Sequence, residues 1–345
     1  MNINDLKFGL DTFGDSSVDE QGNPQSDAQT IRNIVEQAKL ADELGLHGIN
    51  IGEHHREDFA VSAPDTVLAG IATVTKNIIL GTGVTVLSSE DPVRVYQRFA
   101  TIDAMSNGRT EITAGRGSFI ESFPLFGYGL EDYEVLFEEK LELLKEILKE
   151  GPVTWSGKTR GPLKNQEIYP KTEGKNIRLR VGVGGSPDSV VRAARLEIPM
   201  ALAIIGGDPA RFAPFARLYR EQLQKFGHQQ LPLSIHSPGH IAETDDEAFE
   251  QCWPNYAENF GRIGRERGWG PMSIEHYIQE VNQGSLYVGS PETVAKKIAY
   301  AIESVGAQRF DMKYVTGPLP HELAMKSIEL YATEVVPRVK AILTK

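Results

Sequence analysis

The chain has very little cysteine and no long apolar run. Only one of its 345 residues, Cys252, is a cysteine, which excludes an internal disulfide framework and a zinc site built on cysteines. No segment reaches the roughly 20 apolar residues that a membrane-spanning helix needs. The first residues lack the basic and apolar regions of a signal peptide, so we expect a soluble, cytoplasmic protein that does not contact membranes.

The chain also lacks an excess of basic residues. It has 36 Lys and Arg residues against 47 Asp and Glu residues, a net charge of −11. This charge argues against a general affinity for nucleic acid but leaves room for a local basic pocket for one phosphate. The apolar share of 40% allows a sizeable core, and barrels of alternating strands and helices reach this length as one domain, here residues 1–345.

Strand and helix patterns alternate along the chain. Strands are predicted at 8–13, 48–51, 78–87, 110–114, 179–183, 200–205, 233–236 and 309–314. Most gaps between them have apolar residues at helical spacing, as in 28–44, where the pattern stops at Gly45. The α/β pattern predicts a (β/α)8 TIM barrel. A doubly wound open sheet is the alternative, weakened because no G-x-G-x-x-G follows the first strand.

Two insertions interrupt this alternation, after strands 4 and 7. Residues 151–170 are rich in Gly, Thr, Lys and Pro, and we expect an extended excursion there. Residues 261–286 contain five glycines, and a loop of that length is often a binding element. We expect it to be a mobile lid, with Trp269 and Tyr277 able to cover an apolar ligand.

Glu53, His54 and His55 follow the second predicted strand directly. Side chains alternate across a strand, so one histidine should face a site at the strand end and the other should face packing. Imidazole changes charge near neutral pH, which makes a histidine there a candidate acid or base. The alternative is that both are polar residues that merely close the strand. Because other polar and glycine-rich segments also follow strand ends, where such barrels carry active sites, we favour the functional interpretation.

Two strand ends suit a phosphate. Arg116 lies between two glycines, and its planar guanidinium could bind a phosphate with two hydrogen bonds. Gly185 and Ser186 precede a predicted helix that begins at Pro187, and free N–H groups at a helix start bind anions. The alternatives are that Ser186 is an ordinary N-cap and that Arg116 pairs with a carboxylate such as Glu121.

A set of short segments carries a resemblance to the bacterial luciferase-like flavin monooxygenases over nearly the whole chain. The matching segments are Ala41-Asp42-Glu43-Leu44-Gly45, Glu53-His54-His55, residues 80–87, Pro92-Val93-Arg94, residues 102–109, Gly115-Arg116-Gly117, Ile198-Pro199-Met200 and residues 288–292. Each segment is weak alone, but their order and spacing are specific. The chain departs from the luciferases at Asp91, where they have a histidine, and at Gly115, where they have a cysteine, which leaves the substrate open.

The resemblance implies reduced FMN at the C-terminal mouth of a parallel barrel, with dioxygen and a small organic substrate as reactants. It implies an NAD(P)H-dependent reductase as the source of the reduced flavin, and a homodimer. It also implies a non-proline cis peptide bond between Gly83 and Val84. The residue roles that it implies are flavin contacts by Gly83, Val84 and Thr85, phosphate contacts by Arg116, Gly185, Ser186 and Ser189, and acid–base catalysis by His54.

Three other functions fit the sequence. A deazaflavin-dependent oxidoreductase resembles the luciferases too, and a flavin-binding protein without turnover would have the same cofactor site. A metal-dependent barrel hydrolase could use Glu53, His54 and His236, although the first strand has no His-x-His; we expect no metal. Cys252 lies in a predicted helix and is expected to be a packing residue.

Overall fold

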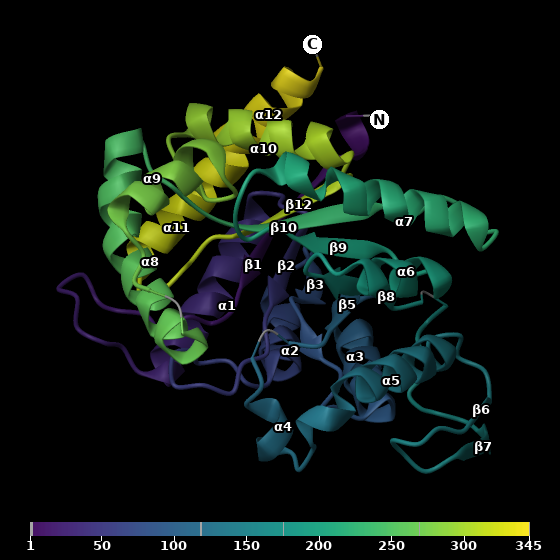
Figure 1. Cartoon of the computed structure of the whole chain (residues 1–345). Helices are drawn as coiled ribbons and strands as arrows, with labels where there is room; N and C mark the ends of the chain where they lie inside the picture. Colours follow the sequence, from purple (N-terminus) through teal and green to yellow (C-terminus); the bar gives the residue numbers. More distant parts are fainter. Residues whose placement is uncertain (1–2, 118, 175, 269, 345) are drawn as a thin grey trace.

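Eight parallel strands close into a barrel in the computed structural model (Figure 1), which describes residues 3–117, 119–174, 176–268 and 270–344, without the side chains at 263, 266 and 267. In order around the barrel, the strands are β1 (Lys7–Thr12), β2 (Gly48–Ile51), β3 (Ile79–Thr82), β5 (Thr110–Gly115), β8 (Arg178–Val183), β9 (Met200–Ala203), β10 (Leu233–Ile241) and β12 (Arg309–Lys313). The last strand pairs with the first, so the sheet has no edge between them. The predicted (β/α)8 barrel is therefore confirmed, and the open-sheet alternative is wrong.

Helices surround the barrel, as Figure 1 shows. They are α1 (Asp27–Glu43), α2 (Pro64–Val74), α3 (Pro92–Ser106), α5 (Tyr133–Ile147), α6 (Pro187–Arg195), α7 (Ala213–Lys225), α10 (Pro291–Val305), α11 (His321–Leu330) and α12 (Val336–Leu343). Shorter helical turns are η1 (Ile3–Asp5), α4 (Ser122–Leu125), η2 (Leu130–Asp132), η3 (Pro209–Phe212) and η4 (Tyr331–Val335). The apolar faces of the helices and the strands form one continuous core that includes Leu10, Ile49 and Phe310.

The predicted third strand, 78–87, is interrupted. It forms β3 and the short strand β4 (Thr85–Val86), and the Gly83–Val84 peptide bond between them is cis, as predicted. Strand β4 pairs with β5, in the register Thr85 to Ala114 and Val86 to Gly115. The segment therefore stays beside β5 on both sides of the interruption, with its register shifted by one residue.

The insertion after strand 4 contains an antiparallel pair, β6 (Val153–Trp155) and β7 (Leu163–Gln166), in agreement with the expected extended excursion. The prediction of a loop at 261–286 is wrong. Helix α8 (Asp245–Arg267) runs through its first part, followed by α9 (Ile274–Gln283), and β11 (Tyr287–Gly289) then pairs with β10. Glycine costs a helix only about 1 kcal/mol relative to alanine, which the packing of α8 and α9 in a second apolar cluster can offset.

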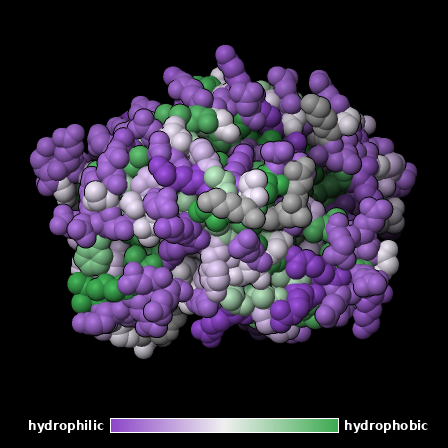
Figure 2. Space-filling view, turned by 90° about the horizontal axis from the view of Figure 1, so that it is seen from above, coloured by the Kyte–Doolittle hydropathy of each residue, from purple (hydrophilic) through white to green (hydrophobic). Residues whose placement is uncertain are grey.

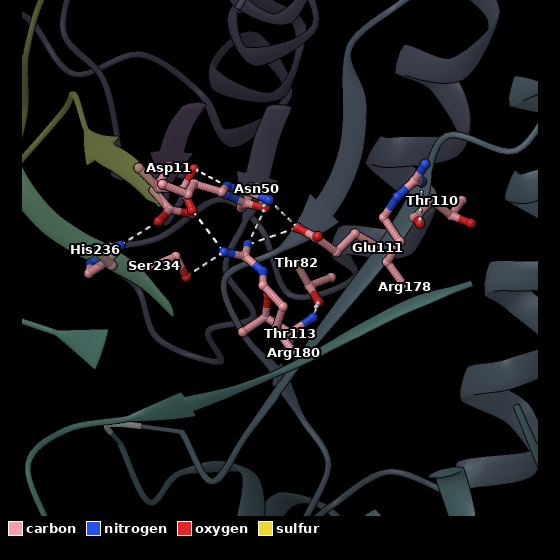
Figure 3. A network of polar contacts seen from close by, with 12 residues as sticks. Asp11, Asn50, Thr82, Thr110, Glu111, Thr113, Arg178, Arg180, Ser234 and His236 are labelled. Atoms are coloured by element: carbon pink, nitrogen blue, oxygen red, sulfur yellow. Dashed lines mark hydrogen bonds and ion pairs between the residues drawn. The ribbon is translucent and has the colours of Figure 1, made fainter. Parts of the chain in front are cut away.

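Charged side chains fill the middle of the barrel (Figure 3). Arg180 binds Glu111 and Asp311, each at 2.9 Å. Arg309 binds the same two carboxylates at 2.8 and 2.7 Å. Burial opposes ionisation of Glu111 and Asp311, but the two guanidinium groups outweigh it and hold the pKa of each carboxyl below its ordinary value. The two positive and two negative charges therefore balance each other within one layer of the barrel interior, next to the layer at the C-terminal mouth.

The outer surface is mostly polar. Figure 2 shows one face of the molecule on which hydrophilic side chains predominate and hydrophobic atoms occur in small separate groups. Among the described helices, none has the length and apolar character that crossing a membrane would require.

Candidate active site

The predicted site residues gather at the C-terminal ends of adjacent strands. His54 follows β2, Gly83 to Thr85 lie between β3 and β5, Arg116 follows β5, and 185–189 follow β8. Because β2, β3, β5 and β8 are neighbours and parallel, these segments form one continuous sector of the barrel mouth. The mouth is where such barrels carry their active sites.

His54 is buried at the end of β2 and is enclosed by aromatic rings. Its ring centroid lies 4.7 Å from that of Phe13, 4.4 Å from that of Phe59 and 5.4 Å from that of Phe119. Burial, with smaller contributions from nearby cations, lowers the pKa of His54 to about 3, so the imidazole is neutral. Its Nε2 is buried and has no hydrogen-bond partner among the described residues.

His55 points elsewhere, as the alternation of side chains predicted. Its Nε2 lies 3.0 Å from Glu53 Oε1, and its ring packs edge-on against Phe126. The second oxygen of Glu53 accepts a hydrogen bond from the backbone N–H of Val86 at 2.8 Å. Glu53 therefore links His55 to β4, which makes His55 a residue that supports the mouth from outside.

The segment from Gly83 to Thr85 is packed tightly. A Cβ at Gly115 would lie 2.5 Å from a methyl carbon of Val84, and a Cβ at Gly83 would lie 2.5 Å from Asp11 Oδ1. The hydroxyl of Thr85 donates to Thr82 Oγ1 at 2.9 Å, inside the sheet. The structure therefore leaves no space for side chains at Gly83 and Gly115, and the Thr85 hydroxyl is engaged away from the mouth.

Arg116 and Ser189 meet, as the phosphate interpretation requires. The Arg116 guanidinium donates to Ser189 Oγ at 3.3 Å. The alternative, that Arg116 pairs with a carboxylate, is borne out, but with another partner: Arg116 forms an ion pair with Glu134 on α5, whereas Glu121 binds Arg56. The sequence could not have shown this partner, because α4 and η2 lie between Arg116 and Glu134.

Glu134 is bound by a second arginine that sequence reasoning missed. Arg192, one turn after Ser189 on α6, donates to the other Glu134 oxygen at 2.9 Å. Glu134 is 62% exposed, while the Arg192 side chain is 10% exposed. An exposed carboxylate thus lies between two guanidinium groups beside α6, an arrangement that favours an anion.

The turn before α6 is open to a ligand. Gly185 has φ +101°, a conformation in which a side chain would be strained, and a Cβ at Gly184 would meet no atom within 4 Å. Ser186 occupies the N-cap position but its side chain makes no capping hydrogen bond. The alternative interpretation of Ser186 as an ordinary side-chain cap is therefore wrong.

Sequence reasoning also missed a pair that spans β12, Asp11 on β1 and His236 on β10. His236 Nδ1 is bonded to Asp11 Oδ2 (Figure 3). Asp11 is 3% exposed. A charged residue inside the otherwise apolar strand 8–13 was the signal that could have revealed it, because a buried carboxylate requires a partner.

Two sequence interpretations do not fit the described residues. Tyr277, expected to cover a ligand, is fully buried against Trp253 and Phe249; Trp269 lies outside the described residues. The residues of the proposed metal hydrolase do not converge, since Glu53 binds His55 and His236 binds Asp11. In the described part of the chain, no group of three or more His, Cys, Asp and Glu residues could hold a metal ion.

Cys252 is buried in the second apolar cluster, as expected of a packing residue. Burial raises the pKa of its thiol to about 11. The thiol is therefore protonated and unreactive at neutral pH.

A cavity of about 290 Å³ lies beside the mouth, between the loop after β1 and helix α8. Its lining includes Asp15, Asp58, Glu258 and Arg262. Asp15 also binds Lys313, whose ammonium lies over the Phe13 ring, at 2.9 Å. The cavity and the mouth thus share a wall, and the size of the cavity suits a small ligand.

Solved structures with this fold include monooxygenases and coenzyme F420 dependent enzymes. The monooxygenase RslO1 from Streptomyces bottropensis superposes with a TM-score of 0.82 at 22% identity, over 96% of this chain and 99% of that chain. The oxygenating constituent of 3,6-diketocamphane monooxygenase from Pseudomonas putida, in complex with FMN, gives 0.77 at 19% identity, over 97% and 98%. The coenzyme F420 dependent tetrahydromethanopterin reductase from Methanopyrus kandleri gives 0.73 at 19% identity, over 97% and 99%.

Sequence comparisons point to the same group. An uncharacterised protein of Sinorhizobium fredii is 34% identical over 140 residues, which is 40% of each chain. The alkanal monooxygenase alpha chain of Photobacterium leiognathi is 22% identical over 92% of this chain and 95% of its own. The profile of the luciferase-like monooxygenases matches residues 10–309. The chain belongs to the luciferase-like monooxygenase family.

Proposed function

We propose that the protein is a flavin-dependent monooxygenase that uses reduced FMN and dioxygen to oxygenate a small organic substrate. The observation that carries this proposal is the meeting of Arg116 and Ser189 at the open start of α6. A family relationship and a similar fold in an FMN complex support it.

The phosphate of FMN would be held by Arg116, Ser189 and the N–H groups of Gly185 and Ser186. The Glu134 carboxylate already occupies an anion position there, bound by two guanidinium groups. A phosphate carries more charge and more acceptor oxygens than a carboxylate, so it can replace Glu134 with stronger charge-assisted hydrogen bonds.

The isoalloxazine ring would lie against the backbone of Gly83, Val84 and Thr85. Only glycine fits at Gly83 and Gly115, so this segment is closely packed. Bound reduced flavin supplies the electrons for dioxygen activation, and the protein positions it and controls its protonation.

His54 would act at the ring as a neutral imidazole. Its unpartnered Nε2 is able to exchange a proton or a hydrogen bond with a ligand in the mouth. The rings of Phe13, Phe59 and Phe119 around it exclude water. Exclusion of water prevents the side reaction in which dioxygen is released as hydrogen peroxide before the substrate is oxygenated.

The substrate would be a small and largely apolar organic molecule. The aromatic rings around His54 favour an apolar ligand. Lys313, which lies at the mouth, is compensated by Asp15, so it does not favour an anionic substrate.

The other assignments are proposals as well. We propose one domain over residues 1–345, a homodimer, and reduction of the flavin by a separate NAD(P)H-dependent reductase. Sedimentation of the purified chain tests the dimer, and the requirement for added reductase tests the source of electrons.

A deazaflavin is the second candidate cofactor, because an F420-dependent reductase has the same fold. Titration of the purified chain with oxidised FMN, riboflavin and F420, followed by absorbance, separates the candidates. We expect saturable FMN binding that is tighter than riboflavin binding. Preferential binding of F420 would replace FMN in the proposal, and no binding of any of the three would overturn it.

A further inference from the structure

Asp11 and His236 form a dyad that connects the barrel interior with the mouth. They lie on β1 and β10, which are separated by β12, so their bond spans one strand on the inside of the barrel. Asp11 Oδ2 binds His236 Nδ1, and Asp11 Oδ1 is buried without a hydrogen-bond partner among the described residues. That free oxygen lies against Gly83, where a Cβ would be 2.5 Å away. The dyad therefore adjoins the segment proposed to contact the flavin ring.

The other nitrogen of His236 is available to a ligand. The His236 side chain is 15% exposed, and Nε2 makes no hydrogen bond within the described part of the chain. Phe13 stacks on the His236 ring at 5.7 Å with an interplanar angle of 9°. The ring orientation is therefore fixed twice, by Asp11 at its edge and by Phe13 at its face.

The other charges around the dyad are already paired. The charged side chains packed against the dyad are Arg180 on β8, Asp311 and Lys313 on β12 and Asp15 after β1. The other titratable neighbour, His54 after β2, is neutral. Arg180 binds Asp311, and Lys313 binds Asp15. The β9 partner of His236 is Ala203, which is uncharged. Proton exchange at the dyad therefore leaves these two neighbouring ion pairs intact.

The two histidines of the mouth have different environments. His54 is enclosed by phenylalanine rings and has no carboxylate partner, and its pKa of about 3 keeps it unprotonated at neutral pH. His236 has a carboxylate on Nδ1, which fixes the orientation of its ring. Burial raises the pKa of Asp11, and the His236 imidazole opposes this rise. Of the two histidines, His236 is partly exposed and held by a carboxylate, so it is the one placed to pass a proton to a ligand.

We propose that His236, positioned by Asp11, delivers the proton that is consumed when dioxygen oxidises the reduced flavin in the mouth. Without an organic substrate, anionic reduced FMN, dioxygen and one proton give oxidised FMN and hydrogen peroxide. Two electrons pass from the flavin to dioxygen, the flavin N–H supplies one peroxide proton, and His236 Nε2–H supplies the other. This inference rests on the proposed flavin function. Asp11 is a positioning residue in it, since it acts through His236.

The test compares His236→Gln and Asp11→Asn with wild type in stopped-flow oxidation of reduced FMN, with the protein in excess and the pH varied around neutral. We expect His236→Gln to slow oxidation by roughly a hundredfold and to lose the pH dependence of the rate. Asp11→Asn should shift that pH dependence to lower pH, because the imidazolium loses its carboxylate. Affinity for oxidised FMN should stay within about twofold in both variants, since neither residue faces the phosphate site.

His321→Gln is the matched control. His321 also pairs with a carboxylate, Glu36 at 3.1 Å, and its side chain is also 15% exposed, but it lies between α11 and α1. This variant should oxidise reduced FMN as wild type does. A wild-type rate and pH profile in His236→Gln would overturn the proposal, as would an equal loss in His321→Gln.

A second measurement needs neither a variant nor a cofactor. NMR of the wild-type chain with isotope-labelled histidine should show neutral His236 with its proton on Nδ1, the nitrogen that Asp11 binds. Neutral His236 with its proton on Nε2 would overturn the dyad even if FMN binds. Absence of FMN binding together with the Nδ1 tautomer would instead contradict the proposed function and leave the dyad geometry standing.

Discussion

Replacement of Arg116 by alanine should weaken FMN binding and leave riboflavin binding nearly unchanged. The phosphate that Arg116 would bind is the group that riboflavin lacks. A hydrogen bond to a charged group contributes about 1.5–3 kcal/mol. In the free protein Arg116 is held by Glu134, which is 62% exposed, and an exposed ion pair contributes about 0–1 kcal/mol. Because FMN must displace Glu134, we expect a net loss of about 2 kcal/mol, or roughly 30-fold in Kd.

The assay is quenching of FMN and riboflavin fluorescence in parallel titrations. Arg195→Ala is the control, since Arg195 lies on the same helix but binds Glu138 and Glu142 instead of Glu134. It should leave both affinities within about twofold of wild type. Glu134→Gln should strengthen FMN binding by up to about fivefold, because the competing charge is gone. The reasoning would be refuted if Arg116→Ala weakened both ligands equally.

Three further substitutions test other parts of the structure. Gly115→Ala should destabilise the fold by about 1–3 kcal/mol, seen as a lower melting temperature, because the new Cβ would lie 2.5 Å from Val84; an unchanged melting temperature would contradict the packing. His54→Ala should keep FMN affinity but slow flavin oxidation by roughly a hundredfold in stopped-flow measurements, and an unchanged rate would remove His54 from the chemistry. Burial opposes ionisation of Asp42, but three backbone N–H groups of 76–78 hold its pKa below the ordinary 3.8. Asp42→Asn should therefore cost about 1–3 kcal/mol at neutral pH. In denaturant unfolding, that difference should shrink as the pH falls below 3.8 through the folded pKa; a constant difference would argue against the charge.

The elements of the barrel could be predicted from local pattern. The expected strand Gly48–Ile51 has the observed bounds, and the helix expected to begin at Pro187 does begin there. Buried parallel strands give short apolar runs, and proline at a helix start marks the boundary. The same rules placed His54 and Arg116 at strand ends, and hence at one end of the barrel.

Partners distant in sequence could not be predicted. Arg116 had several carboxylates within reach of its loop, and only the packing of α5 against α6 selects Glu134 over Glu121. Residues 261–286 were misjudged for a related reason. The glycine content shows how much free energy a helix would cost locally. The apolar contacts that offset this cost, such as that of Tyr277 with Trp253, form only in the folded chain.

The charged layer inside the barrel and the mouth are parts of one arrangement. Glycines on β1 and β3 make room for it, since a Cβ at Gly9 would overlap Asp311 and one at Gly81 would overlap Asn50. Arg180 of this layer favours the ionised form of Asp11, and Asp311 opposes it. The residues that fill the barrel therefore also set the charge beside His236. A substitution such as Arg180→Met would remove a core cation and leave Glu111 and Asp311 with one fewer partner. It would also disfavour the ionised form of Asp11, which positions His236. A mutation in the barrel interior therefore changes both the stability of the fold and the chemistry at the mouth.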